Sequence, residues 1–220
     1  MSKIITDEKQ IDKLLSRGVE NIYPSKEEFK KVLLSGKKLS IYSGVDPTAP
    51  TLHIGHGVVF LKLRELQDLG HEVILLLGDF TGRIGDPTDK DSTRKQLTKK
   101  EVKNNLKSYT KQASKILDMK KIKVRFNSKW LAKLTLAYIV EITSEFTLQQ
   151  MIERDMFEKI MAAGHPIYLH EFLYPLMQGY DSVAMNVDVE IGGNDQTFNM
   201  LMGRTMMKTR GKEKYVLTTK

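Results

Sequence analysis

The chain has 220 residues, 40% of them hydrophobic and 28% charged, values typical of a protein that folds around its own core. It contains no cysteine, which excludes disulfides, thiolate metal ligands and a cysteine nucleophile, and its net charge of +8 favours a polyanionic partner. No apolar run approaches the roughly 20 residues that cross a bilayer, and the polar N-terminus has no signal-peptide core, so we expect a cytoplasmic protein.

Residues 1–38 have the pattern of an amphipathic helical arm. Apolar residues recur there at helical spacing, at Ile11, Leu14, Leu15 and Val19. A second helix is expected to start after Ser25, a good N-cap residue, and to stop near Gly36. We expect this arm to pack against one larger domain that spans residues 39–220.

The most informative stretch is Tyr42–His56, which reads Y-S-G-V-D-P-T-A-P-T-L-H-I-G-H. The apolar run 39–45 suits a buried strand, and residues 57–70 have helical spacing, so the stretch joins a strand to a helix. In open α/β sheets, such junctions lie where ligands bind. The free N–H groups of the first helical turn, together with His53 and His56 as cationic or donor groups, predict a phosphate-binding site.

The remaining elements alternate as in an α/β protein. Strands are expected at 72–77, 121–126, 188–195 and 215–219, and helices at 102–117, 130–164, 167–184 and 197–209. Thr147 and Gln150 form a capping-box pattern inside the second of these helical regions. From Arg94 to Arg125 the chain carries twelve basic residues and two acidic ones, which is either a solvated helix face or an RNA-facing patch.

Two segments carry candidate ligand-binding side chains. In the glycine-rich loop 78–87, Asp86 precedes a proline that holds it out of the helical region, so it either binds a ligand ammonium or caps its own turn. In the predicted helix 167–184, Tyr174, Gln178 and Asp181 share one face. A polar stripe on an otherwise apolar helix indicates polar partners for these side chains, either a ligand or solvent.

Several of these motifs resemble one family. D-P-T-A-P-x-L-H-I-G-H is similar to the HIGH signature of class I aminoacyl-tRNA synthetases, in the form that tyrosyl-tRNA synthetases use. G-D-P at 85–87, Y-x-x-x-Q-x-x-D at 174–181 and G-G-x-D-Q at 192–196 also resemble that family. The resemblance covers nearly the whole chain. It implies an α/β, Rossmann-like nucleotide-binding fold, with a parallel sheet flanked by helices.

The resemblance also implies an architecture and an assembly. A helical connective insertion at about 127–165 makes much of the dimer contact in that family, so we expect a homodimer. The chain ends at Lys220, before the family's second signature, K-M-S-K-S, and before its anticodon-recognising region. We therefore interpret the chain as a truncated catalytic domain.

The implied activity is ATP-dependent activation of L-tyrosine to tyrosyl-adenylate, followed by transfer to tRNA(Tyr), with Mg²⁺ accompanying ATP. By resemblance, the substrate ammonium contacts Asp86, Tyr174 and Gln178, and Asp46 helps to place the ammonium or the adenylate. Asp181 accepts from the phenolic hydroxyl, Tyr42 donates to it, and Gln196 lies near the carboxylate or the α-phosphate.

The resemblance assigns the nucleotide a second set of residues. The phosphates are expected near Thr48, His53, His56, Lys90 and Arg94, although the last two also fit a solvated basic surface. Asp195 would bind the ribose, and the nucleotide-binding glycines would be Gly44, Gly55 and Gly193. No protein ligand set for a metal is expected, and Glu190, where the family often has glutamine, receives no role.

Two alternatives stay open. A tryptophanyl-tRNA synthetase shares the fold and both motif regions, but it should lack the phenol acceptor at Asp181. A non-catalytic RNA-binding relative would use the basic run, bind RNA with a steep salt dependence and not bind tyrosine. A dehydrogenase-like dinucleotide fold is disfavoured because no G-x-G-x-x-G opens a helix after a strand.

Overall fold

The computed structural model describes residues 4–84, 97–152 and 155–220. Within them, six strands form one sheet in the order β1-β6-β5-β2-β3-β4, in which every neighbouring pair is parallel except β1 and β6. The strands are β1 (Val19–Tyr23), β2 (Ser40–Val45), β3 (Glu72–Leu77), β4 (Ile122–Phe126), β5 (Val189–Gly193) and β6 (Tyr215–Thr219). The predicted α/β class and mostly parallel sheet are confirmed.

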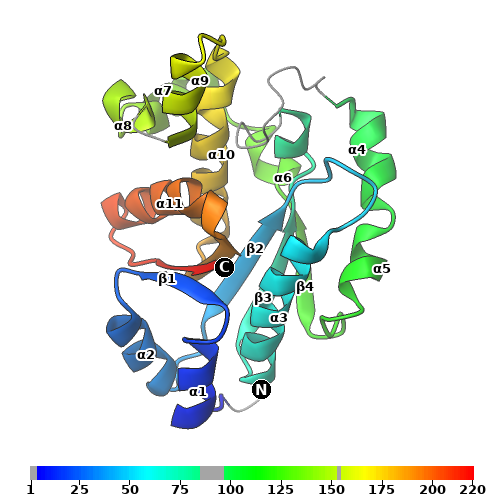
Figure 1. Ribbon diagram of the computed structural model, residues 1–220, viewed down its shortest axis with the longest axis vertical. Coiled ribbons are helices and arrows are strands. Elements are labelled where there is room, and N and C mark those ends of the chain that lie inside the picture. Colours follow the sequence, from blue (N-terminus) through cyan, green and yellow to red (C-terminus); the bar gives the residue numbers. More distant parts are fainter. Residues whose placement is uncertain (1–3, 85–96, 153–154) are drawn as a thin grey trace.

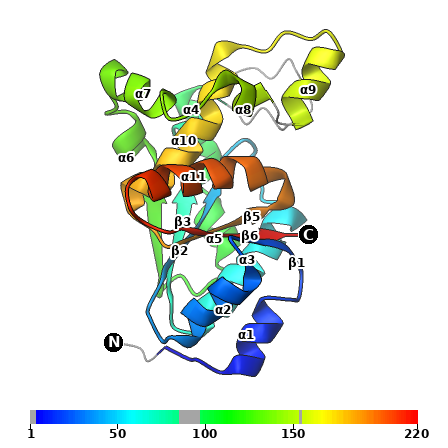
Figure 2. The ribbon, with the colours of Figure 1, turned by 90° about the vertical axis from the view of Figure 1, so that its left-hand side faces the viewer.

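Helices cover both faces of this sheet (Figures 1 and 2). They are α1 (Glu8–Leu14), α2 (Lys26–Leu34), α3 (Ile54–Asp68), α4 (Lys99–Leu106), α5 (Tyr109–Ala113), α6 (Ser128–Leu131), α7 (Leu136–Thr143), α8 (Leu148–Ile152), α9 (Asp155–Ala162), α10 (Leu169–Met185) and α11 (Thr197–Thr209). Two short 3-10 turns lie at Thr81–Arg83 and Asn194–Gln196.

The alternation of side chains in β2 and β3 separates two cores. Ile41 and Leu75 belong to the larger core, which α1, α2, α3 and α5 cover. Tyr42 and Ile74 point the other way, into a smaller cluster that Trp130 borders. Tyr42 therefore lies beneath α10, buried, although it comes from the central strand.

The strand-to-helix junction forms as predicted. Strand β2 ends at Val45, and α3 begins at Ile54 with His53 as its N-cap residue. The predicted caps are also confirmed: Ser25 accepts the N–H of Glu28 at 3.2 Å, and Thr147 exchanges two hydrogen bonds with Gln150.

The prediction of a wholly helical N-terminal arm is wrong for residues 19–23. These residues form β1, which runs antiparallel to β6 at the edge of the sheet, and the N–H of Asn21 donates to Thr218 Oγ1 at 2.9 Å. A strand of this kind depends on a partner almost 200 residues away in the sequence, so local spacing cannot reveal it. The domain division at residue 38 stays a prediction.

Two predicted helices are broken into shorter ones. The region 102–117 contains α4 and α5, separated at Lys107–Ser108, and the region 130–164 contains α6 to α9. Helices α7, α8 and α9 stand beyond the carboxyl ends of the strands, whereas α1 and α2 lie at the opposite end (Figure 1). Over the described residues, no helix is both long and apolar enough to cross a membrane.

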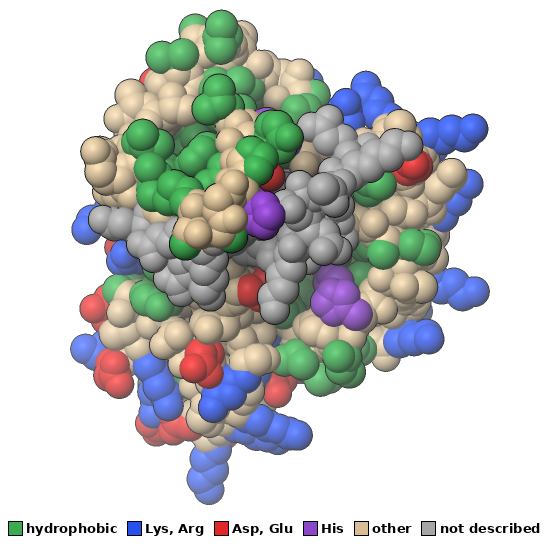
Figure 3. All heavy atoms as spheres, turned by 45° about the horizontal axis from the view of Figure 1, so that its top comes forward, with side chains coloured by type: hydrophobic (Ala, Val, Ile, Leu, Met, Phe, Trp, Pro, Cys, Tyr) green, Lys and Arg blue, Asp and Glu red, His purple; other side chains and the backbone are tan. Residues whose placement is uncertain are grey.

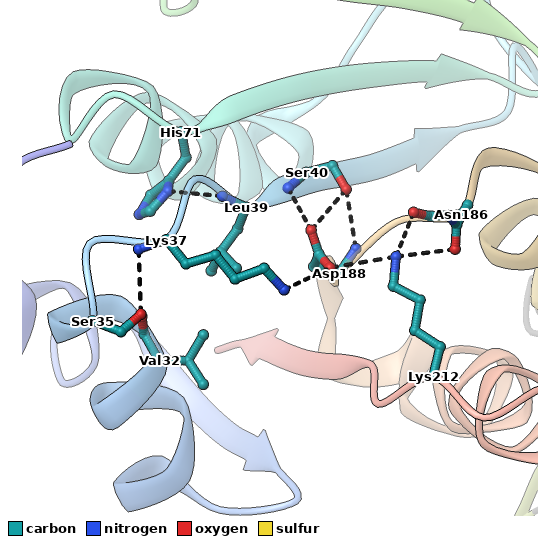
Figure 4. A network of polar contacts seen from close by, with 9 residues as sticks. All are labelled: Val32, Ser35, Lys37, Leu39, Ser40, His71, Asn186, Asp188 and Lys212. Atoms are coloured by element: carbon teal, nitrogen blue, oxygen red, sulfur yellow. Dashed lines mark hydrogen bonds and ion pairs between the residues drawn. The ribbon is translucent and has the colours of Figure 1, made fainter. Parts of the chain in front are cut away.

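Polar contacts join the amino ends of β2 and β5 (Figure 4). Asp188, just before β5, accepts from the backbone N–H of Ser40 at 2.9 Å and from its hydroxyl at 3.0 Å. Lys212 lies 3.3 Å from the same carboxylate and also donates to the carbonyl of Asn186 at 2.6 Å. The contacts tie the loop before β5 to the first residue of β2.

Candidate active site

A cavity of about 410 Å³ opens at the carboxyl ends of β2 and β5. The chain continues from β2 to β3 on one side of the sheet and later returns to β5 on the other side, so the cavity lies at the switch point of the topology. Every predicted site residue that the structure describes lines this cavity: Tyr42, Gly44, Asp46, Thr48, His53, Gly55, His56, Tyr174, Gln178, Asp181, Gly193, Asp195 and Gln196. Asp86, Lys90 and Arg94 lie outside the described residues.

The two histidine rings contact each other at the N-terminus of α3, with an interplanar angle of 49°. Their ring centroids are 3.8 Å apart, and the N–H of His53 donates to Nδ1 of His56 at 3.2 Å. Burial, and then the neighbouring His53, lower the pKa of His56 to about 4, against a smaller opposite effect of Asp195. His56 is therefore neutral at pH 7, with Nε2–H as its donor. A Cβ on Gly55 would lie only 3.0 Å from the His53 ring, so glycine lets the rings take this position.

The Asp46 carboxylate joins three elements of the cavity wall. Its two oxygens accept from the hydroxyl of Thr81 at 2.7 Å and from the hydroxyl of Tyr174, on α10, at 3.0 Å. A Cβ on Gly78 would overlap the Asp46 side chain. Glycine at the end of β3 therefore makes room for a carboxylate that follows β2.

Among the described carboxylates of the predicted set, Asp181 is the most buried, with 2% of its surface exposed. One oxygen accepts from Trp130 Nε1 at 2.7 Å, and the other accepts from Asn127 Nδ2 at 3.2 Å. Burial raises the pKa of Asp181 well above its usual value; the two donors oppose this, and the charges of Asp46 and Glu190 add to it. A ligand hydroxyl donating to this carboxylate would therefore stabilise its charged form.

Below the cavity, a hydrogen-bond chain connects Tyr42 to Glu190. The Tyr42 hydroxyl lies 2.8 Å from Ser182 Oγ, and Ser182 Oγ lies 3.4 Å from Glu190 Oε2. The other oxygen of Glu190 accepts from Gln178 Nε2 at 3.1 Å. Burial, and then Glu190, raise the pKa of Tyr42 well above 10, so its phenol stays protonated.

The loop after β5 forms the opposite wall. Gln196 Nε2 donates to Asp195 Oδ2 at 2.9 Å, while Asn199 Nδ2 donates both to Gln196 Oε1 and to Gln178 Oε1 at 2.9 Å. Asn199 thus links Gln178 to Gln196, and Gln196 in turn donates to Asp195, the predicted ribose contact.

Sequence reasoning missed several residues that shape this cavity or hold its side chains, among them Thr81, Asn127, Trp130, Ser182, Glu190, Asn199 and Lys214. The sequence did carry an indication for Glu190, because a carboxylate within a buried strand needs a partner. Nothing in the local sequence links Trp130 to Asp181, 51 positions away.

Comparisons with known proteins agree with this geometry. A family model described as tRNA synthetases class I (W and Y) matches residues 34–220. A tyrosine--tRNA ligase of Carboxydothermus hydrogenoformans is 54% identical over 91% of this chain and 49% of its own length. One of Moorella thermoacetica is 50% identical over 93% of this chain and 50% of its own. The chain thus spans about half the length of these relatives.

Solved structures show the same fold. The crystal structure of a C-terminally truncated mitochondrial tyrosyl-tRNA synthetase from Aspergillus nidulans has a TM-score of 0.82 and 27% identity, over 96% of this chain and 68% of that one. Its counterpart from Coccidioides posadasii has a TM-score of 0.79 and 26% identity, over 96% and 66%. The predicted Rossmann-like class I fold is confirmed.

Proposed function

This chain belongs to the class I tRNA synthetases (W and Y), and we propose from that membership that it carries the tyrosine-activating site of a tyrosine--tRNA ligase. The reaction would be the in-line attack of the tyrosine carboxylate on the α-phosphate of ATP. The products are tyrosyl-adenylate and pyrophosphate, and the tyrosyl group then passes to tRNA(Tyr). No covalent enzyme intermediate is needed, so the residues act by positioning and by stabilising charge.

The observation that carries the choice of tyrosine is the buried carboxylate of Asp181. Trp130 and Asn127 each donate a hydrogen bond to one of its oxygens and so fix its orientation, and the carboxylate lines the cavity. A phenol can donate to it, whereas phenylalanine would leave it without that donor. Sites of this kind reject the analogue that lacks the hydroxyl by about 10⁴–10⁵, a range for which tyrosyl-tRNA synthetase is itself the known example.

The amino end of the substrate would meet Tyr174 and Gln178, with Asp86 as the third contact and Asp46 close to the adenylate. Asp46 and Tyr174 already share a hydrogen bond of 3.0 Å, which supports a joint role. The Tyr42 hydroxyl, paired with Ser182, would serve as the second contact of the substrate phenol. Gln196 would face the carboxylate or the α-phosphate.

ATP would occupy the other half of the cavity. The first turn of α3, neutral His56, His53 and Thr48 would donate to the phosphates, with Lys90 and Arg94 assisting. Asp195 would accept from the ribose hydroxyls, and Gly44, Gly55 and Gly193 would let the nucleotide approach the backbone. Mg²⁺ would accompany ATP on its phosphates.

Two macromolecular contacts follow. The lysines of α4 and α5 project into solvent along one edge of the molecule (Figure 3), a surface that we assign to tRNA. Exposed apolar side chains gather on the α7–α9 end, namely Leu136, Val140, Leu148, Met161 and Leu169. We assign this apolar end to a homodimer contact, because monomeric proteins rarely expose such a patch. Sedimentation at several concentrations tests the dimer.

Titration calorimetry with tyrosine, phenylalanine and tryptophan tests the amino-acid assignment. We expect saturable binding of tyrosine and none of phenylalanine at the same concentrations. Preference for tryptophan would move the chain to the sister enzymes of the family. Binding of none of the three by folded protein, together with salt-sensitive RNA binding, would support a non-catalytic RNA-binding relative instead.

A further inference from the structure

A buried ion pair lies beneath the amino-acid half of the cavity. Glu190, on β5, is 2% exposed, and Lys214, just before β6, is fully buried. The Lys214 ammonium donates to Glu190 Oε2, and it also donates to the carbonyl of Met200 at 3.1 Å. Breaking such a pair is costly, since it leaves one charge uncompensated.

Glycine at position 203 leaves the room that the Lys214 ammonium occupies. Gly203 of α11 faces Gly179 of α10, and a Cβ on Gly203 would lie 2.6 Å from Lys214 Nζ and 3.0 Å from Ser182 Oγ. Lys214 Nζ also lies 5.8 Å from the centre of the Tyr42 ring. The lysine thus occupies a closed slot between the two helices and the floor of the cavity, where no solvent can replace its partner.

The hydrogen bonds around Glu190 have only one possible direction. An ionised carboxylate accepts and cannot donate, so Gln178 must turn its Nε2 toward Glu190, as it does at 3.1 Å. Gln178 Oε1 is then left as an acceptor, with Asn199 as one donor at 2.9 Å. A substrate ammonium is a donor only, and it needs that oxygen.

We propose that Glu190 and Lys214 are positioning residues that set the orientation of the Gln178 amide, so that its oxygen is available to the substrate ammonium. Lys214 makes the carboxylate obligatory. A glutamine at position 190 would turn its oxygen to Lys214 and its NH₂ to Gln178, which would then have to rotate and face the ammonium with a donor. The inference rests on the proposed function, because it assumes that the cavity binds tyrosine.

The test uses three ligands and four forms of the protein. Tyrosine and tyramine carry the ammonium, whereas 3-(4-hydroxyphenyl)propionate has the phenol without it. Wild type is compared with Glu190→Gln, with the double variant Glu190→Gln/Lys214→Met, and with Lys212→Met as a control two positions away. Affinities are measured by calorimetry, after thermal denaturation has shown that each variant is folded.

For Glu190→Gln we expect tyrosine and tyramine to lose affinity about tenfold or more, the value of a hydrogen bond to a charged group. The propionate should keep its affinity. The double variant should regain the affinity for both ammonium ligands, because without Lys214 the glutamine can turn its oxygen to Gln178. Lys212→Met should bind all three ligands like the wild type.

Equal losses for all three ligands, unchanged tyramine binding in Glu190→Gln, or no recovery in the double variant would each overturn the positioning role. Failure of the wild type to bind tyrosine would instead overturn the proposed function, so the two failures can be told apart. If Glu190→Gln alone does not fold, the double variant still decides: it must match the wild type in its tyrosine-to-propionate affinity ratio.

Discussion

The two ends of the parallel sheet use the same kinds of side chain in opposite ways. At the amino end, Asp188 accepts two hydrogen bonds from Ser40 and lies within 4 Å of Lys212 and Lys37 (Figure 4). Burial alone would raise the pKa of Asp188, but the Ser40 bonds and the Lys212 charge outweigh burial and lower it. This carboxylate is more stable charged in the folded protein than in the unfolded chain.

At the carboxyl end the balance is reversed. Asp181 is held among polar donors but faces the negative charges of Asp46 and Glu190, and its pKa is raised well above the usual value. A raised carboxylate pKa means that charging Asp181 at neutral pH costs folding free energy. The Asp188 network therefore stabilises its own charge within the protein. The charge of Asp181 lacks such compensation, which is typical of a site that binds a ligand.

The largest expected effect is on tyrosine binding by Asp181→Asn. The variant removes the charged acceptor for the phenol, and we expect tyrosine affinity to fall about a hundredfold, equivalent to about 3 kcal/mol. Stability at pH 7 should change little, because relief from the cost of charging Asp181 is offset by the loss of one of the two oxygens that accept from Trp130 and Asn127. Calorimetry gives the affinity, and urea denaturation gives the free energy of unfolding.

A fall in stability with unchanged tyrosine affinity would contradict this reading of the carboxyl end. In that case Asp181 would resemble Asp188, and the distinction between the two ends would be lost. The matched control is Asp188→Asn, which should leave tyrosine affinity unchanged.

The second prediction concerns pH and His71, at the amino end. Its Nδ1 accepts the N–H of Leu39 at 3.3 Å, its Nε2 has no partner among the described residues, and 5% of the residue is exposed. Burial, and then Lys38, lower the pKa of His71 to about 4. As the pH falls below 6.5, the unfolded chain takes up a proton that the folded one excludes. We expect about 2–3 kcal/mol to be lost between pH 6.5 and pH 4.

Urea denaturation at several pH values measures this loss, and His71→Asn should remove most of it. His56 titrates in the same window with a pKa of about 4. It is more exposed, so His56→Asn should remove a smaller share. Identical pH dependence in wild type and His71→Asn would show that the imidazole is not excluded from water as the structure indicates.

The sequence predicted those parts of the site that lie within one or two neighbouring elements. The junction from β2 to α3 was predicted because strand pattern, helix pattern and histidines are contiguous. Tyr174, Gln178 and Asp181 were grouped because helical spacing alone puts them on one face. The resemblance to the synthetases supplied the expected role for each.

The sequence could not predict contacts that depend on how distant segments meet. Asn127 and Trp130 follow directly after β4, and they contact Asp181 only because α10, which carries it, packs back against them after the helices α7–α9. Glu190, on β5, contacts Lys214 because Lys214 lies just before the neighbouring strand β6. Strand β1 pairs with β6 although the two lie almost 200 residues apart in the sequence. These partners are set by sheet order, which no local period encodes.

The third prediction is the stability of the control variant Asp188→Asn. Asparagine keeps one oxygen for the Ser40 N–H but loses the charge and the second acceptor. We expect a loss of about 1–2 kcal/mol at pH 7. Because the folded pKa is lowered, this difference should be present above the unfolded pKa and vanish as the pH falls through the folded one. A difference that persists at lower pH would assign the loss to packing and not to charge.

The smallest effect separates the two lysines on the Asp188 carboxylate. Lys37 lies 3.8 Å from it with 65% of its side chain exposed, whereas Lys212 lies 3.3 Å away with 28% exposed and also donates to Asn186. Exposed ion pairs contribute little, so Lys37→Met should change the free energy of unfolding by less than about 0.5 kcal/mol. Lys212→Met should cost about 1 kcal/mol, because Asn186, at φ 50°, loses two hydrogen bonds that hold the turn before β5. Equal losses in urea denaturation would mean that charge alone, and not the geometry of the turn, holds the amino end together.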